Sequence, residues 1–125
     1  MSSQVRSFGV LVVEDEDLIR LVTIEAVEDA GLQAYDAADA SEAIAHLERV
    51  SDIKVALIDV DLIGQMNGVE LAHLIRDRWP DIGIIICSGL VRIGEKDLPT
   101  GTSFLAKPYK LSDAIQLIQA SNGTA

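Results

Sequence analysis

The sequence predicts a single α/β domain, built on a doubly wound, five-stranded parallel sheet with helices on both faces. Three observations predict this fold: five short apolar runs, amphipathic segments between them, and a length of 125 residues, which suits one domain. The runs at 8–13 and 82–87 are almost wholly apolar and do not alternate with polar residues, as is typical of parallel strands covered on both sides. Strict alternation of strand and helix favours a parallel sheet.

The first half of the chain predicts three strands and two helices. Residues 8–13 form the first strand, and apolar residues at helical spacing over 18–30 predict a helix that ends before Gly31, which suits a left-handed C-terminal cap. A weaker strand follows at 32–35. Asp39 with Glu42 three residues later is a capping-box pattern, which predicts a second helix through about residue 48. The third strand covers 55–60.

The second half predicts the remaining elements. Asn67 with Glu70 repeats the capping-box pattern, and this helix must stop near Trp79 because Pro80 disfavours helical geometry in the residue before it. Strands follow at 82–87 and 103–106, and Ser112 is predicted to cap a last helix. Two glycines and a proline interrupt the pattern between 89 and 102, so we expect the fourth of five helices to be short or irregular.

Composition excludes several classes of partner. Ten Lys and Arg against twenty Asp and Glu give a net charge of −10, which argues against binding to nucleic acid or to a membrane surface. The one cysteine, Cys87, excludes an intrachain disulfide and suits a reducing compartment. No apolar stretch reaches the length of a membrane span or of a signal peptide's apolar region. We therefore expect a cytoplasmic protein.

Polar residues follow the predicted strands at the point where each strand ends. The carboxyl ends of parallel strands meet at one edge of a sheet, so these side chains should lie close together. Crowded carboxylates need a counter-ion, and Mg²⁺ suits oxygen ligands of this kind. An ionised Asp beside Mg²⁺ and a Lys can attack a phosphoryl group as a nucleophile. The strand-end residues are Glu14, Asp15, Asp59, Asp61, Ser88 and Lys107.

The chain resembles the receiver domain of bacterial two-component response regulators. The resemblance covers nearly the whole chain and implies the flavodoxin-like strand order 2-1-3-4-5, with 1–125 as one single-domain receiver whose core spans about 7–120. It is carried by five segments in the right order on the right strand ends. They are Val-Val-Glu-Asp-Glu (12–16), Leu-Ile-Asp-Val-Asp-Leu (57–62), Met-Asn-Gly (66–68), Cys-Ser-Gly (87–89) and Phe-Leu-Ala-Lys-Pro (104–108).

The resemblance implies a metal site and a phosphoacceptor. Asp59 would accept a phosphoryl group from the phosphohistidine of a sensor histidine kinase or a histidine phosphotransfer protein. Asp15 and Asp59 would bind Mg²⁺ directly, Glu14 through a water molecule, and Asp61 through its backbone carbonyl.

The resemblance also implies a switch. Lys107 would pair with Asp59 or with the phosphoryl group, and Ser88 would donate its hydroxyl to a phosphoryl oxygen. Phe104 corresponds to the aromatic residue that rotates inward when Ser88 moves. Family members often have a cis peptide bond before the proline at 108. The protein would then be a signalling switch that acts on a downstream protein target and not an enzyme, with phosphotransfer and dephosphorylation directed only at itself.

Three features depart from the usual family pattern. The segment from Asp59 to Gly68 is slightly longer than usual and has Ile63-Gly64-Gln65 in place of a proline-containing loop. The segment from Ser88 to Lys107 is shorter than in typical members, which again predicts a reduced fourth helix. Phe104 lacks the hydroxyl of the more usual tyrosine, so burial alone would drive an inward rotation.

Other functions fit the residues less well. A phosphate-independent scaffold that only binds partner proteins would not need Asp15, Asp59, Ser88 and Lys107 together. The stretch from Asp59 onward matches a calcium loop in part, but Ile63 stands at a ligand position and no helix is predicted before it.

Small phosphatases of the haloacid dehalogenase type share the Asp-Val-Asp pattern at 59–61 but place it after their first strand. A flavin phosphate would be repelled by the acidic residues at 14–17. His46 and His73 have no partner at metal-ligand spacing, and we expect structural roles for both, as for Cys87 and Trp79 in or beside the core.

Overall fold

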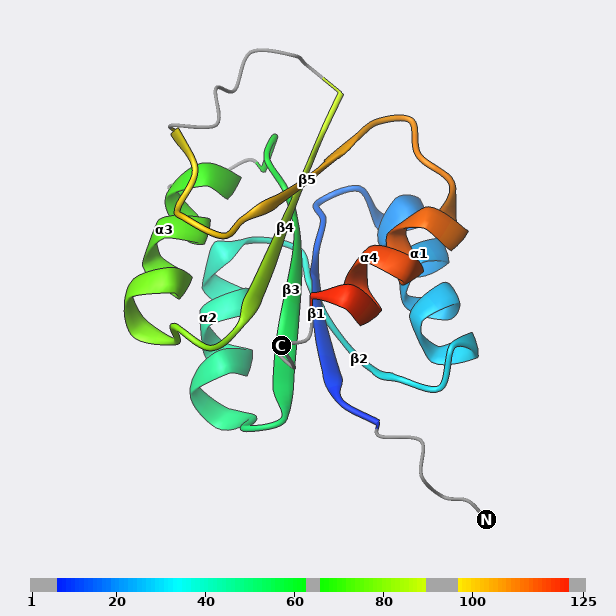
Figure 1. Cartoon of the computed structure of the whole chain (residues 1–125), viewed down its shortest axis with the longest axis horizontal. Helices are drawn as coiled ribbons and strands as arrows, with labels where there is room; N and C mark the ends of the chain where they lie inside the picture. Colours follow the sequence, from blue (N-terminus) through cyan, green and yellow to red (C-terminus); the bar gives the residue numbers. More distant parts are fainter. Residues whose placement is uncertain (1–6, 63–65, 90–96, 122–125) are drawn as a thin grey trace.

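The computed structural model describes residues 7–62, 66–89 and 97–121 and confirms the predicted fold class. Five strands, each parallel to its neighbours, lie in the order β2-β1-β3-β4-β5. Helices α2 and α3 cover one face of the sheet, and α1 and α4 cover the other (Figure 1). The strands are β1 (Gly9–Val13), β2 (Gln33–Ala37), β3 (Ile53–Asp59), β4 (Gly83–Ser88) and β5 (Ser103–Ala106), and the helices are α1 (Asp17–Asp29), α2 (Ala40–Arg49), α3 (Gly68–Arg78) and α4 (Leu111–Ala120).

The core has one layer on each face of the sheet. In β1, Leu11 and Val13 pack toward α2 and α3, whereas Val10 and Val12 pack toward α1 and α4. Both sets are buried, which explains why the strand sequence shows no polar alternation. Each buried aliphatic side chain of this size contributes roughly 1.5–3 kcal/mol. The strand ends that carry the predicted site residues are therefore held by a rigid sheet.

Side-chain caps fix the start of two helices. At α3 the Asn67 side chain accepts a hydrogen bond from the Glu70 N–H (2.9 Å), and the Glu70 carboxylate accepts one from the Asn67 N–H (3.0 Å), as the capping-box pattern predicts. At α2 the Asp39 side chain accepts from the Glu42 N–H (2.9 Å). Glu42 completes only part of the predicted box, because its carboxylate accepts instead from the Ala38 N–H (2.7 Å).

The C-terminal ends of α1 and α3 follow the sequence prediction, but the start of α4 does not. Gly31 has a φ of +86°, the left-handed conformation expected after α1, and α3 ends at Arg78 with Trp79 as its C-cap. The prediction that Ser112 caps the last helix is wrong. Helix α4 begins at Leu111, and its N-cap Lys110 makes no side-chain capping bond, so Ser112 lies within the first turn.

The predicted short or irregular fourth helix lies mainly on residues 90–96, outside the described residues. The described part of that segment, 97–102, contains no α-helix. Among the helices that the structure describes, none combines the length and apolar character needed to cross a membrane.

Candidate functional site

Three carboxylates meet at the carboxyl end of the sheet. Glu14 and Asp15 follow β1, and Asp59 is the last residue of β3, so the β1–β3 pairing brings them together. Each offers a carboxylate oxygen, and these oxygens all lie within 4.8 Å of one another. Glu14 and Asp59 are each only 5% exposed, and Asp15 is half-buried. The structure therefore brings together the three side chains that the sequence predicted as metal ligands.

Backbone groups hold two of these carboxylates in place. The Asp59 Oδ1 atom accepts a hydrogen bond from the Asp61 N–H (3.0 Å), and the Glu14 Oε2 atom accepts one from the Glu16 N–H (3.1 Å). The Asp61 side chain is exposed, and Asp61 contributes its backbone to this arrangement. A carboxylate with one oxygen fixed by the backbone keeps its other oxygen available for a cation or a reacting group.

Lys107 supplies the positive charge that faces the carboxylates. It follows β5 directly, and its N–H donates to the Ser88 carbonyl at the end of β4 (2.9 Å). Its ammonium lies 3.2 Å from Asp59 Oδ2 and 3.7 Å from Glu14 Oε1. Burial lowers the pKa of Lys107, but the negative charges of Asp59 and Glu14 outweigh this effect and raise the pKa above its ordinary value. Lys107 is therefore a permanent cation at the site.

Among the described residues, only the Lys107 ammonium forms an ion pair with this carboxylate cluster, and one such charge does not balance three carboxylates. Burial raises the pKa of Glu14 from its ordinary 4.5 to about 7, opposed by the hydrogen bond from Glu16 and reinforced by the charge of Asp59. A hard divalent cation with oxygen ligands would offset the cost of ionising this buried carboxyl group beside two other carboxylates. The donor set therefore fits Mg²⁺ by its chemistry, and it is the only such group among the residues that the structure describes.

The predicted switch residues lie on the neighbouring strands. Ser88 ends β4, is 2% exposed, and pairs in register with Ala106 next to Lys107. Phe104 pairs in register with Ile86, and its side chain is 47% exposed, so the ring points away from the core in this structure. The Lys107–Pro108 peptide bond is cis, as the resemblance implies.

Gly68 is required for the close approach of α3 to Asp59. A Cβ atom added there would overlap the Asp59 carbonyl oxygen and would lie 2.6 Å from the Val60 Cα. The Gly68 N–H donates to the Val60 carbonyl (3.2 Å), so the first turn of α3 rests on the backbone that carries Asp59. This close contact gives a physical reason for the glycine of the Met-Asn-Gly motif, which in the sequence was only one of the segments that carry the family resemblance.

Comparison with known proteins decides the family. The model of the response regulator receiver domain matches residues 10–119, which is most of the chain. The chain belongs to this family. The receiver domain is 32% identical over 109 residues to the sensor kinase CckA of Brucella abortus, in a match that covers 84% of this chain and 11% of that protein. It is 26% identical over 114 residues to the response regulator receiver protein CpdR of the same organism, covering 88% of this chain and 92% of that protein.

Solved structures agree with this assignment. The receiver domain of NtrX from Brucella abortus superposes with a TM-score of 0.81 at 26% identity, covering 93% of this chain and 99% of that one. The receiver domain of the Francisella response regulator 1452 shares the fold, with a TM-score of 0.82 at 23% identity, and covers 93% and 97% of the two chains.

An apolar groove of about 690 Å³ lies beside the site, between the start of α1 and the segment after β5. Leu18 is 72% exposed and Val22 is 39% exposed, although helical spacing alone would place both on the apolar face of α1. This face is therefore only partly covered by the receiver domain itself. The groove, called the apolar groove below, is lined by Leu18, Ile19, Val22, Thr23, Gly89, Lys107, Pro108, Tyr109 and Leu111.

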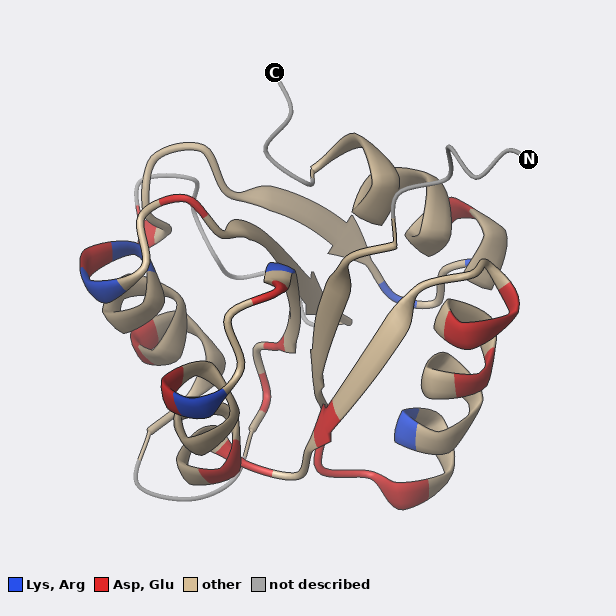
Figure 2. Cartoon of the chain, turned by 90° about the horizontal axis from the view of Figure 1, so that it is seen from below, with Lys and Arg blue, Asp and Glu red and all other residues tan. Residues whose placement is uncertain are grey.

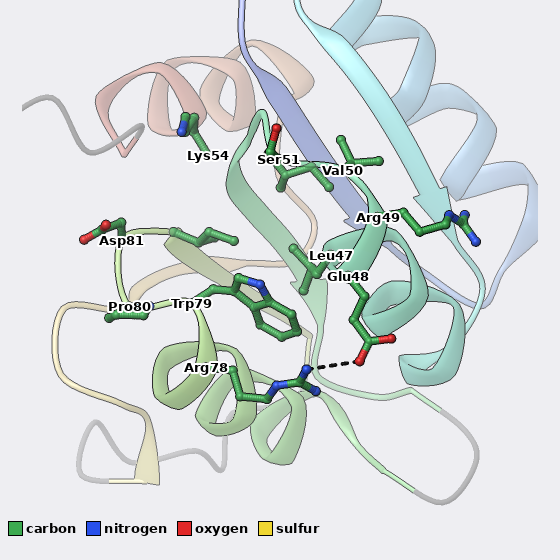
Figure 3. A pocket seen from close by; sticks show the side chains of 12 residues that line it. Leu47, Glu48, Arg49, Val50, Ser51, Lys54, Arg78, Trp79, Pro80 and Asp81 are labelled. Atoms are coloured by element: carbon green, nitrogen blue, oxygen red, sulfur yellow. Dashed lines mark hydrogen bonds and ion pairs between the residues drawn. The ribbon is translucent and has the colours of Figure 1, made fainter.

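A second hollow, of about 390 Å³, lies at the opposite end of the sheet, near the starts of β3 and β4 (Figure 3). The Arg78 guanidinium lies 4.4 Å from the centre of the Trp79 ring and 3.0 Å from the Glu48 carboxylate. Acidic residues are spread over the helices of both layers (Figure 2), but no metal-ligating group of three forms at this end among the described residues. Trp79 packs against the core here, as predicted, and lines this hollow beside the start of β3, whereas Asp59 is the last residue of that strand.

Other side chains have the structural roles that the sequence predicted. The His46 and His73 rings lie 2.8 Å from the carbonyl oxygens of Asp36 and Asp97, and Cys87 is buried in β4. Tyr109, for which the sequence predicts no role, lines the apolar groove and lies beside Cys87 in the lining of a smaller cavity. In the sequence, the one distinguishing feature of Tyr109 is that it follows Pro108, and this position does not predict which residues the ring contacts.

Proposed function

We propose that this receiver domain is a phosphorylation switch of the bacterial cytoplasm. Asp59 accepts a phosphoryl group from the phosphohistidine of a sensor histidine kinase or a histidine phosphotransfer protein, with Mg²⁺ bound by Asp15, Asp59, the Asp61 carbonyl and, through water, Glu14. One observation carries the proposal: the buried Asp59 carboxylate clusters with two other carboxylates and lies 3.2 Å from the Lys107 ammonium.

The transfer exchanges one bond to phosphorus for another. A carboxylate oxygen of Asp59 forms a P–O bond while the P–N bond of the phosphohistidine breaks, and the imidazole nitrogen leaves with the electron pair. When bound by these residues, Mg²⁺ would neutralise negative charge on the phosphoryl oxygens. Lys107 stabilises the negative charge of a phosphoryl oxygen, and the Ser88 hydroxyl donates a hydrogen bond to another. Later attack by water on phosphorus restores the Asp59 carboxylate.

The phosphodonor docks at the apolar groove. The groove opens beside Lys107 and Gly89, next to the site, and is lined mostly by apolar side chains. The exposed Leu18 and Val22 would be covered by an apolar helix face of the donor protein, which places a phosphohistidine on that helix near Asp59. Docking by apolar contact is consistent with a chain of net charge −10, which gives no general attraction for a phosphorylated partner.

Phosphorylation changes a protein-binding surface at the β4–β5 edge. The Ser88 side chain is buried at the end of β4, and a hydrogen bond to the phosphoryl group would draw it toward Asp59. The exposed Phe104 ring on β5 then gains room to turn inward, and burial of its apolar surface would favour that state. The output is recognition by a downstream protein target, with no substrate other than the domain itself.

The test is covalent labelling with a small phosphodonor. The protein is incubated with acetyl phosphate and Mg²⁺, and intact mass is measured over time. We expect an adduct of one phosphoryl group that is absent in Asp59→Asn and absent when a chelator removes Mg²⁺. The matched control, Asp81→Asn, changes an exposed aspartate beside the second hollow and should keep the adduct. No adduct with any donor would instead favour a phosphate-independent scaffold.

A further inference from the structure

Two cavities beside Asp59 are separated by one side-chain wall. The apolar groove lies on the outer side. On the inner side, a cavity of only about 10 Å³ reaches the acidic cluster and is lined by Val12, Val13, Glu14, Thr23, Leu57, Asp59, Cys87 and Tyr109. Thr23 and Tyr109 line both spaces. A group that fills the apolar groove therefore contacts residues that also face the phosphoacceptor.

The Tyr109 hydroxyl joins the two sides of this wall. It interacts electrostatically with the side chains of Cys87 on β4 and Thr23 on α1, and all three residues line the inner cavity. The Thr23 hydroxyl in turn donates to the Ile19 carbonyl (2.8 Å), which fixes it to the helix. Burial raises the pKa of Tyr109 well above its ordinary value, so the phenol keeps its proton at any pH at which the protein works.

Cys87 connects Tyr109 to Asp59. The two residues are register partners on adjacent parallel strands, so their side chains point to the same face of the sheet. The Cys87 carbonyl also accepts a hydrogen bond from the N–H of Val60, the residue after Asp59 (2.9 Å). Cys87 is buried, and close-packed interiors transmit small displacements because they contain little free space.

We infer that Tyr109 is a positioning residue that couples occupancy of the apolar groove to the placement of Asp59. A partner side chain entering the groove presses on the Tyr109 ring, and the contact with Cys87 passes the displacement to the phosphoacceptor. This inference rests on the proposed function and adds regulation to it: a docked partner changes the reactivity of Asp59 as well as delivering the phosphoryl group. Without the hydroxyl, the ring moves independently of Cys87.

A double-mutant cycle with a small phosphodonor isolates this coupling, because acetyl phosphate does not need the groove. Val22→Phe partly fills the groove, and Tyr109→Phe removes the hydroxyl and keeps the ring. We expect Val22→Phe to change the phosphorylation rate constant about threefold or more in the parent and to have little effect in Tyr109→Phe. The matched control is Tyr35→Phe, which removes the hydroxyl of the other tyrosine, 3.2 Å from Asp52 Oδ1, and should leave the effect of Val22→Phe intact.

Each outcome separates the coupling from a merely structural role and from the proposed function. A structural role of Tyr109 would lower the thermal midpoint yet give additive effects, and additive effects overturn the inference. So would the absence of any rate change on filling the groove. If Val22→Phe does not fold, Leu18→Trp replaces it, since the Leu18 side chain is mostly exposed. A parent protein that acetyl phosphate never labels would refute the proposed function instead.

Discussion

The charged side chains at the two ends of the sheet differ in burial and in pairing. At the amino end, Arg78 pairs with Glu48 on the surface, and the Arg76 guanidinium donates to the Pro80 and Ile82 carbonyls. At the carboxyl end, two buried carboxylates, with a third half-buried one beside them, lie against the Lys107 ammonium. Exposed ion pairs contribute about 0–1 kcal/mol, whereas buried charge without a balancing partner is costly. This contrast supports the proposal that the carboxyl end binds a cation and carries the reaction, whereas the charges at the amino end serve packing.

The largest expected effect comes from removing the Lys107 ammonium, which pairs with the Asp59 and Glu14 carboxylates. Lys107→Ala should lower the rate constant for labelling by acetyl phosphate about 10²-fold, because one stabilising contact to the phosphoryl group is lost. The fold should persist, because the Lys107 side chain lies at the rim of the sheet and the β5 backbone stays paired with β4. Intact mass measures the rate, and circular dichroism checks the fold.

A matched control at the amino end of the sheet distinguishes a specific role of Lys107 from a general effect of removing a positive charge. Arg78→Ala removes an arginine whose ion pair with Glu48 is exposed, and it should leave the labelling rate unchanged while altering the free energy of unfolding by less than about 1 kcal/mol. A loss of the folded state in Lys107→Ala, or an equal loss of labelling in both variants, would contradict the assignment of Lys107.

Two glycines without room for a Cβ atom, one near each end of the sheet, also test the difference between the carboxyl end and the amino end. Gly68→Ala would force a methyl group against the backbone of Asp59 and Val60, within the sheet, and should destabilise the domain by about 1–3 kcal/mol and slow labelling. Gly83→Ala would overlap the Ser121 backbone carbonyl at the C-cap of α4, at the other end of the sheet from Asp59. It should also destabilise the domain but leave labelling unchanged. Urea unfolding and intact mass together distinguish the two.

The raised pKa of Glu14 predicts a pH dependence in metal-free protein. Since the folded-state pKa is about 7 and the ordinary value is 4.5, the folded state binds the extra proton, and stability from this group falls as pH rises between these values. Glu14→Gln removes the titration. In a chelator it should match the parent near pH 4.5 and exceed it above pH 7, by up to about 3 kcal/mol.

Urea unfolding of both proteins across pH 4.5–8 measures this difference. Added Mg²⁺ should raise the stability of the parent most at the higher pH values, where the carboxylates are ionised and bind the cation. A stability difference that is the same at every pH would show that Glu14 does not hold the proton.

The fold and the residues of the candidate site could be predicted from the sequence, whereas the apolar groove beside the site could not. Strand ends of a parallel sheet converge by geometry, so the placement of Glu14, Asp15, Asp59 and Lys107 followed from the order of the elements. The apolar groove did not follow, because helical spacing identifies an apolar face of α1 but not whether another element covers it.

Two other features also needed coordinates. The role of Tyr109 depends on contacts with α1 and β4 that are distant in sequence, and no local pattern encodes them. The start of α4 was missed because a serine near a helix start caps it only when the backbone turns at that residue, and here the turn comes at Lys110.

The smallest expected effect concerns how long Asp59 stays phosphorylated. A Cβ atom at Gly89 would meet the Lys107 Cβ at 3.4 Å, an ordinary contact, so a side chain can start there, at the edge of the site. Gly89→Val should therefore slow hydrolysis severalfold, because the branched side chain restricts the approach of water to the phosphoryl group. Gly89→Ala serves as the graded control and should give an intermediate half-life. The half-lives are measured by intact mass after removal of acetyl phosphate, and equal values for all three proteins would show that water reaches the phosphoryl group by another path.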